Sequence, residues 1–156
     1  MTAYETSLTV LKELFQRDCQ FVLSTCKDQM PSSRCVDTYY TNGSFWIVTY
    51  AKSQKVREIM ANPNVALCSN LFRFSGKAYN CGHPLKTENS AIRSELIKAF
   101  EPWYFKHNDE GDEAMCYVKV EVEHGFFFKD GTGYDVDFLT QEAKQFPFEM
   151  DIMVLN

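Results

Sequence analysis

The chain has 156 residues, 45% of them hydrophobic and 15% aromatic, which is enough for a single domain over residues 1–156 with a substantial core. Its formal net charge of −5 does not provide the basic field that broad binding to nucleic acid or to an anionic membrane requires. No stretch approaches the roughly 18 apolar residues of a membrane span, and no secretion signal is recognisable. We therefore expect a cytoplasmic protein.

The first predicted elements are a helix and three strands. Helical spacing of apolar residues marks an amphipathic opening helix that contains Leu8, Leu11, Leu14 and Phe15. A buried strand over residues 20–26 ends at the polar turn of residues 27–29. Strands over residues 33–41 and 44–49 are joined across Asn42-Gly43, a dipeptide typical of tight hairpins.

A short helix is predicted next. Ser53 is a good N-cap, Asn62-Pro63 ends the run, and the apolar positions at helical spacing are Val56, Ile59 and Met60. Two more strands are expected over residues 65–70 and 71–80. A helix over residues 88–100 follows, with Thr87 as its cap.

Strict alternation marks the strand that begins near Cys116. Four apolar residues from Cys116 to Val122 alternate with more polar ones, which predicts one wet face that carries Tyr117, Lys119, Glu121 and Glu123. A further hairpin is expected around residues 129–138, and the tail from Gln141 is left unassigned. About seven short strands, mostly linked by hairpins, indicate a mainly β protein, an antiparallel barrel with peripheral helices.

Six cysteines are scattered along the chain without a C-x-x-C motif, and we expect reduced, buried thiols. Cys81-Gly82-His83 resembles the start of a zinc site, but no second pair of ligands accompanies it at a suitable spacing. We therefore predict no metal, and we assign no catalytic side chain.

Positive charge gathers at the start of the helix that follows Ser53. Lys52, Lys55 and Arg57 lie where free backbone N–H groups already favour an anion. With the Ser53 hydroxyl, and with Arg34 brought close by the hairpin, this locus is suited to phosphate. The alternative is that Lys55 pairs with Glu58 while the other basic residues are solvated, and the pattern alone leaves both interpretations open.

The segment SSRCVDTYYTNGSFWIVTYAKSQKVREIMANPNVAL is similar to the flavin-binding core of the pyridoxamine 5′-phosphate oxidase-like family of FMN-binding split-barrel flavoproteins. In that family an arginine, a threonine and a Ser-x-Lys sequence hold the phosphate and ring of FMN. These fall here on Arg34, Thr49, Ser53 and Lys55. Weaker similarity through RFSGKAYNCG and MCYVKVEVEHGFFF extends the match to roughly residues 20–138.

The resemblance implies a Greek-key split β-barrel that forms a homodimer with FMN at the interface. Backbone groups of Cys35 and Val36 would lie along the edge of the ring, although core packing is an equal alternative for Cys35. Tyr50 and Lys52 could contact the ring or phosphate, or be exposed loop residues. Aromatic residues that could meet a ring held by the partner chain are Trp103 and Phe127, with core or dimer packing as the alternative for Trp103.

Two departures limit the functional expectation. The full pyridoxamine 5′-phosphate oxidases carry Arg-Lys where this chain has Gln54-Lys55, and their C-terminal arginine and histidine motif is not found here. We therefore expect an FMN-dependent oxidoreductase that acts with an unidentified small-molecule substrate or electron donor. The alternatives are a flavin-binding or sensing protein without turnover, or a barrel that binds haem or a deazaflavin.

Overall fold

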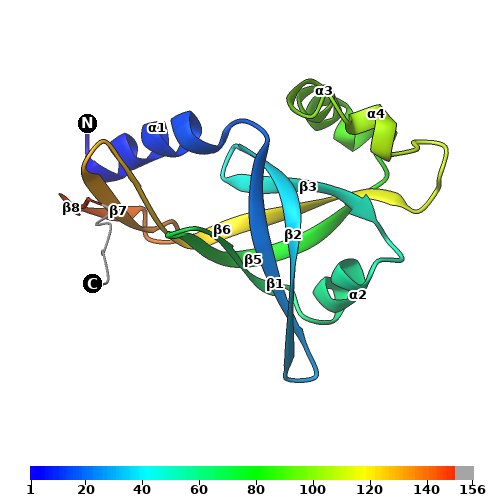
Figure 1. Ribbon diagram of the computed structural model, residues 1–156, viewed down its shortest axis with the longest axis horizontal. Coiled ribbons are helices and arrows are strands. Elements are labelled where there is room, and N and C mark those ends of the chain that lie inside the picture. The colour runs from blue at the N-terminus through cyan, green and yellow to red at the C-terminus, as the bar shows by residue number, and fades with distance from the viewer. Residues whose placement is uncertain (150–156) are drawn as a thin grey trace, which may run out of the picture.

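The computed structural model describes residues 1–149 as a mainly β protein with peripheral helices (Figure 1). The strands are β1 (Cys19–Lys27), β2 (Met30–Thr41), β3 (Ser44–Tyr50), β4 (Asn64–Ser69), β5 (Phe72–Gly82), β6 (Met115–Lys129), β7 (Thr132–Asp137) and β8 (Glu142–Pro147). The helices are α1 (Ala3–Phe15), α2 (Gln54–Ala61), the short 3₁₀ helix η1 (Thr87–Asn89), α3 (Ser90–Ala99) and α4 (Tyr104–His107). None of the helices in this part of the chain is long and apolar enough to cross a membrane.

The strands form one antiparallel sheet that closes on itself. Their order is β3-β2-β1-β4-β5-β6-β7-β8, and an additional pairing of β3 with β6 closes the first six strands into a barrel. The 15-residue β6 is long enough to pair with β3 near its start and with β7 near its end. The predicted antiparallel split barrel is confirmed.

Left-handed backbone at the predicted turns fixes the first two hairpins. Asn42 and Gly43 have φ values of 49° and 82°, and Asp28 and Gln29 have 52° and 64°. Two consecutive positive φ values suit the right-handed twist of the flanking strands, and Asn, Asp and Gly tolerate this conformation best. The hairpins therefore lie where the sequence places them, although β2 begins at Met30 rather than at residue 33.

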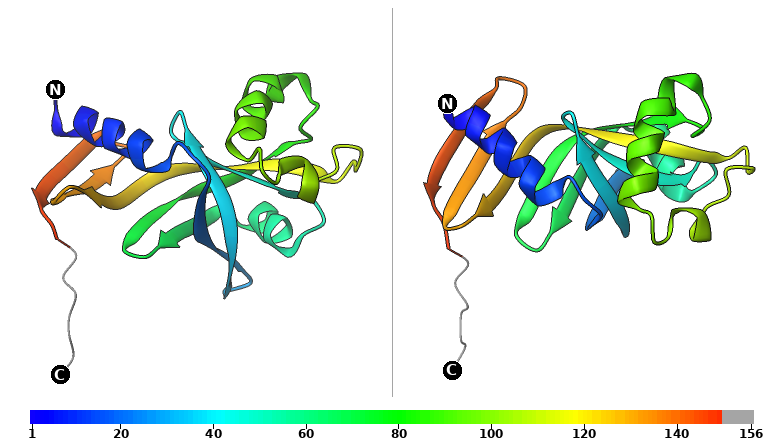
Figure 2. Two further views of the ribbon diagram at one scale, coloured as in Figure 1. Left: turned by 45° about the horizontal axis from the view of Figure 1, so that its top comes forward. Right: turned by 90° about the horizontal axis from the view of Figure 1, so that it is seen from above.

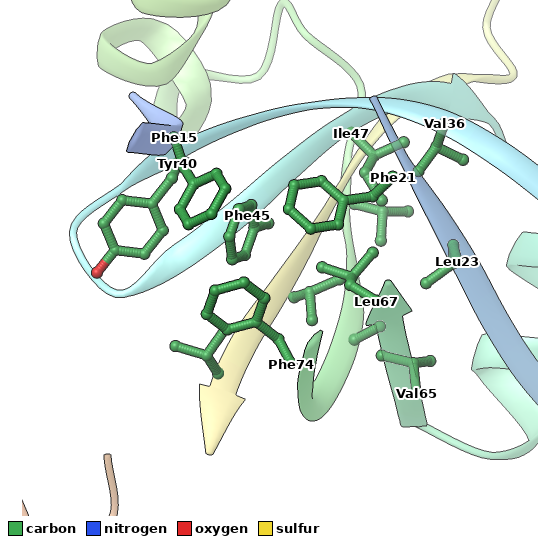
Figure 3. Close-up of a cluster of buried hydrophobic side chains, with 14 of the residues drawn as sticks. Phe15, Phe21, Leu23, Val36, Tyr40, Phe45, Ile47, Val65, Leu67 and Phe74 are labelled. Atoms are coloured by element: carbon green, nitrogen blue, oxygen red, sulfur yellow. The ribbon is translucent and has the colours of Figure 1, made fainter. Parts of the chain in front are cut away.

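Phe15, at the end of α1, lies in the main core with the aromatic side chains of the barrel (Figure 3). Its ring makes edge contacts with Phe45, Phe72 and Phe74 at centroid distances of 5.7, 5.2 and 5.5 Å. Full burial of a phenylalanine contributes about 1.5–3 kcal/mol. The predicted amphipathic helix is confirmed, and it runs beside β7 and β8 at the end of the molecule away from α2 (Figures 1 and 2).

A second apolar layer lies between the barrel and helices α3 and α4. Leu96, Phe100 and Tyr104 are fully buried there against Met115 and Tyr117 of β6. The prediction that Tyr117 belongs to a wet face is wrong. Helices α3 and α4 cover the first part of β6 and leave only the later polar positions near solvent. The buried hydroxyl of Tyr117 forms a hydrogen bond with that of Tyr104.

Two other predictions about the second half of the chain need correction, the helix capped by Thr87 and the number of strands. Thr87 does not cap the long helix: it opens η1, and α3 begins only at Ser90. Asn89, the last residue of η1, makes no side-chain cap bond to α3, and its side chain donates to the carbonyls of Cys81 and His83. The unassigned tail adds β8, which pairs with β7 and brings the strands to eight.

The cysteines are less buried than predicted. Only Cys116 is buried, Cys35 and Cys68 are exposed, and the other three lie in between. All six are free thiols. The apolar neighbours of Cys35 and Cys68 in sequence do not predict burial, since alternate residues of a strand face opposite sides of the sheet.

Candidate functional site

The site lies where β2 and β3 separate. The two strands pair only from Tyr39–Trp46 to Thr41–Ser44, at the hairpin end. Beyond Trp46, β3 continues to Tyr50 along β6, while β2 pairs with β1 from Met30 to Thr38. The barrel is therefore split along the edge of β2 that carries Arg34, Cys35 and Val36, and their backbone is not tied to β3.

A pocket of about 200 Å³ occupies this split. It brings together residues from β2, from β3, from α2 and from the segment before α4. Its lining residues are Arg34, Cys35, Val36, Asp37, Ile47, Val48, Lys55 and Trp103. Five of the nine predicted site residues, Arg34, Cys35, Val36, Lys55 and Trp103, are thus in one place.

Lys55 is the half-buried cation of the pocket. Its Nζ lies 3.0 Å from Oγ1 of the buried Thr49, to which it donates. Among the ion pairs of residues 1–149, none includes Lys55. Burial, and then the neighbouring Arg34 guanidinium, lower the pKa of Lys55, because both disfavour the charged ammonium.

The carboxylate of Glu58 pairs with Arg34 and not with Lys55. Nη2 of Arg34 lies 3.3 Å from Oε2 of Glu58, which is buried on the inner side of α2. The alternative interpretation, a Lys55–Glu58 pair on the helix surface, is therefore wrong. Hydrogen bonds, those from Ser32 and Thr25 foremost, lower the pKa of Glu58 to about 2.

Helix α2 presents its N-terminus beside these charges. Ser53 is the N-cap, and its Oγ accepts a hydrogen bond of 3.4 Å from the backbone N–H of Val56. The apolar side of the helix is narrower than predicted. Val56 and Ile59 are buried, but Met60 is 69% exposed, because the helix turns Glu58 toward Arg34 instead.

Four predicted site residues lie outside the pocket lining. Thr49 accepts a hydrogen bond from Lys55, which does line the pocket. Ser53 caps the start of α2, the helix that carries Lys55. Lys52 is exposed between them. The Tyr50 hydroxyl turns away to the loop after α4, where it accepts a hydrogen bond of 3.3 Å from the backbone of Asp109.

Trp103 and Asp37 line the other side of the pocket, and Asp18 contacts Trp103 from outside the lining. The indole Nε1 of Trp103 donates to Asp18 at 2.8 Å, and its ring stacks on Phe100 with 4.5 Å between centroids. Asp37 faces the pocket from β2, and burial together with the nearby Asp18 charge raises its pKa. The pocket is therefore basic beside α2 and acidic beside Trp103.

Sequence reasoning missed several residues of the site. These include Asp37, Ile47 and Val48, which line the pocket. They also include Glu58, which forms an ion pair with Arg34 but does not itself line the pocket. Asp37 lies two positions after Cys35 on the same strand, so the strand period could have indicated it. The expectation that Phe127 meets a flavin ring is wrong: its side chain is fully buried in the core, where it stacks on Tyr134.

Residues 9–128 match the family model described as pyridoxamine 5′-phosphate oxidase. This match covers more than half of the chain and includes every residue of the pocket. The chain therefore belongs to the pyridoxamine 5′-phosphate oxidase family. It has no significant match among curated proteins.

Solved structures with the same fold belong to proteins that are named for binding several different cofactors. A pyridoxamine 5′-phosphate oxidase-related, FMN-binding protein from Nostoc punctiforme is 12% identical, with a TM-score of 0.56 over 96% of this chain and 98% of that one. The haem storage protein HutZ from Vibrio cholerae is 12% identical, with a TM-score of 0.60 over 83% and 96%. An FAD-binding protein from Mesorhizobium loti is 16% identical, with a TM-score of 0.57 over 76% and 91%.

At such identities these structures establish the fold alone. A mostly β barrel of this family is shared by proteins named for binding FMN, FAD and haem. The ligand of this chain must therefore be argued from its own pocket. Within residues 1–149, no three potential metal ligands of the His, Cys, Asp and Glu types gather into a cluster.

Proposed function

We propose that this protein binds FMN in the split between β2 and β3 and exchanges electrons through it with a small molecule. The observation on which the proposal rests is the environment of the Lys55 ammonium. This ammonium is half-buried beside a second cation, Arg34, and Thr49 is its hydrogen-bond partner. A buried cation of this kind is stabilised by an anion, and phosphate is the anion that the adjacent helix N-terminus favours.

The phosphate end of the proposed site uses three kinds of donor. Lys55 supplies a point charge, Arg34 a guanidinium, and α2 the backbone N–H groups that follow the Ser53 cap. Glu58 offsets part of the positive charge, which leaves one net positive charge among these three side chains. This arrangement fits the phosphate of FMN better than a neutral ligand such as riboflavin.

The ring end of the proposed site is open in a single chain. Pockets for cofactor-sized ligands usually measure about 300–1,000 Å³, whereas this one measures about 200 Å³. The difference supports a homodimer in which a second copy completes the site, with Trp103 and the edge of β2 as the walls supplied by this chain. The exposed outer face of Cys35 is compatible with such a contact.

Bound FMN would supply reversible one- or two-electron transfer at its ring. The protein would bind the phosphate, orient the ring along β2 and limit the access of water. No side chain is required as a nucleophile. None of the lining residues is a histidine, so a haem here would need the Cys35 thiol or a residue from outside the pocket as its ligand.

A visible absorption spectrum of the purified protein, repeated after addition of FMN and desalting, tests the proposal. We expect flavin bands that remain with the protein. Loss of all flavin on desalting would contradict FMN binding, and a haem Soret band in the protein as purified would identify a different cofactor.

The redox part of the proposal has its own test. We expect the bound flavin, once reduced by dithionite or a nicotinamide, to be reoxidised by small acceptors in repeated cycles. Full FMN occupancy without any turnover across a panel of donors and acceptors would favour a flavin-binding or sensing role instead.

A further inference from the structure

The guanidinium of Arg34 donates hydrogen bonds to four acceptors within the protein. Nη1 donates to the Leu23 carbonyl at 3.3 Å and to Thr25 Oγ1 at 2.7 Å. Nη2 donates to Ser32 Oγ at 2.8 Å and to Glu58 Oε2 at 3.3 Å. Each terminal nitrogen of a guanidinium carries two N–H groups, so these four bonds occupy all of them. Only the Nε–H is left for a ligand.

The Glu58 carboxylate accepts hydrogen bonds from other side chains besides Arg34. The hydroxyls of Thr25 and Ser32 both donate to its Oε2, the latter at 2.6 Å, and Gln54 Nε2 donates to Oε1 at 2.6 Å. Three neutral donors would therefore remain on the carboxylate if the guanidinium turned away. In contrast, a bidentate grip on phosphate requires terminal N–H groups that Arg34 now gives to the protein.

We infer that Glu58 is an internal competitor of the ligand phosphate for Arg34, and that it sets how tightly a phosphorylated ligand is held. The inference rests on the proposed binding of FMN at this pocket. To bind Arg34, the phosphate of a ligand must displace the Glu58 carboxylate. The ligand therefore binds less tightly than it would if Arg34 and Lys55 were both free of ion pairs. Removal of the Glu58 charge should strengthen the binding of FMN and leave riboflavin, which has no phosphate, unaffected.

The test compares the dissociation constants of FMN and riboflavin for the wild-type protein and for Glu58→Gln, by flavin fluorescence titration. Glutamine keeps the size and an acceptor oxygen for the two hydroxyls but removes the charge. We expect FMN to bind more tightly by about tenfold or more, because a negative charge that repels the phosphate and occupies Arg34 is removed. Riboflavin should change by less than about twofold, since no charge of the ligand is involved.

Glu142→Gln is the matched control. It removes the same charge from β8, at the end of the molecule away from α2 (Figure 1). Its dissociation constants should equal those of the wild type. Melting temperatures of all variants show whether each one is folded under the conditions of the titration.

A second comparison separates competition for Arg34 from direct repulsion between Glu58 and the phosphate. Arg34→Ala should weaken FMN binding by more than about tenfold and riboflavin binding much less, which also tests the role of Arg34 on its own if Glu58→Gln proves unstable. Adding Glu58→Gln to Arg34→Ala should give a much smaller gain than Glu58→Gln gives in the wild type, because no guanidinium is left to compete for. If Glu58 only positioned Arg34, Glu58→Gln alone would weaken FMN binding.

The outcomes are distinct. Tighter FMN binding by Glu58→Gln, with riboflavin unchanged and with most of the gain lost when Arg34 is absent, supports the competition. Unchanged or weaker FMN binding, an equal gain for both flavins, or a gain that is just as large without Arg34 overturns it. A wild-type protein that does not bind FMN overturns the proposed function itself, a result seen before any variant is compared.

Discussion

Arg34 of β2 and Glu58 of α2 form an ion pair of 3.3 Å at the side of the pocket, with side-chain exposures of 22% and 9%. The pair ties the split strand to the helix that follows the barrel's third strand. It also accounts for part of the positive charge that the sequence concentrates near α2. The other part belongs to Lys55, which faces the pocket without an ion-pair partner among the described residues.

Lys55→Ala should weaken the binding of FMN by about tenfold or more, because one charge-assisted contact with the phosphate is lost. Riboflavin should bind almost as before. Paired titrations of the two flavins check this prediction, with Arg57→Ala, an exposed cation on the same helix, as the control. Equal losses for both ligands would argue against a phosphate contact of Lys55.

Trp103→Ala should affect both flavins alike, because this side chain lines the part of the pocket that is proposed to hold the ring. We expect a loss of roughly 0.5–1.5 kcal/mol from the missing aromatic contact, for FMN and riboflavin equally. Trp103→Phe, which keeps a ring but not the hydrogen bond to Asp18, should retain most of the affinity. A selective loss of FMN in Trp103→Ala would place this residue near the phosphate instead.

Ser53→Ala should lower the free energy of unfolding by about 1 kcal/mol, because the cap bond to the Val56 N–H is lost. Urea unfolding of the ligand-free protein measures this change. Ser53→Thr, which keeps the hydroxyl, should lie close to the wild type. An unchanged stability in Ser53→Ala would mean that water replaces the hydroxyl at this helix end.

Glu58 should make the stability of the protein depend on pH in the acid range. Hydrogen bonds lower its pKa in the folded state to about 2 from the ordinary value of 4.5, so the folded protein binds this proton less readily than the unfolded chain. Its contribution is therefore complete above about pH 4.5 and is lost as the pH falls toward 2.

Urea midpoints of the wild type and of Glu58→Gln between pH 6 and pH 2.5 check this dependence. The stability difference between them should shrink as the pH falls, since glutamine does not titrate. Comparing the two proteins removes the contribution of the other carboxyl groups. A difference that stays constant with pH would show that the Glu58 carboxyl is not stabilised in its charged form.

Local patterns in the sequence determined much of the fold. The Asn42-Gly43 hairpin, the opening helix and the Ser53 cap each depend on neighbouring residues, whose backbone preferences act over a few positions. The same is true of the Ser53-x-Lys55 sequence at the start of α2. The family motif adds Arg34, although the hairpin pairs β2 with β3 only from Tyr39 to Thr41 and does not itself hold Arg34 beside that helix.

Only the tertiary structure decided which side chains meet. Tyr117 is buried because α3 and α4, distant in sequence, cover its face of β6. Glu58 pairs with Arg34 rather than Lys55 because its side of α2 packs toward the barrel. The split that forms the pocket also depends on where β2 leaves β3, and strand separation is set by the packing of the whole barrel rather than by any local preference.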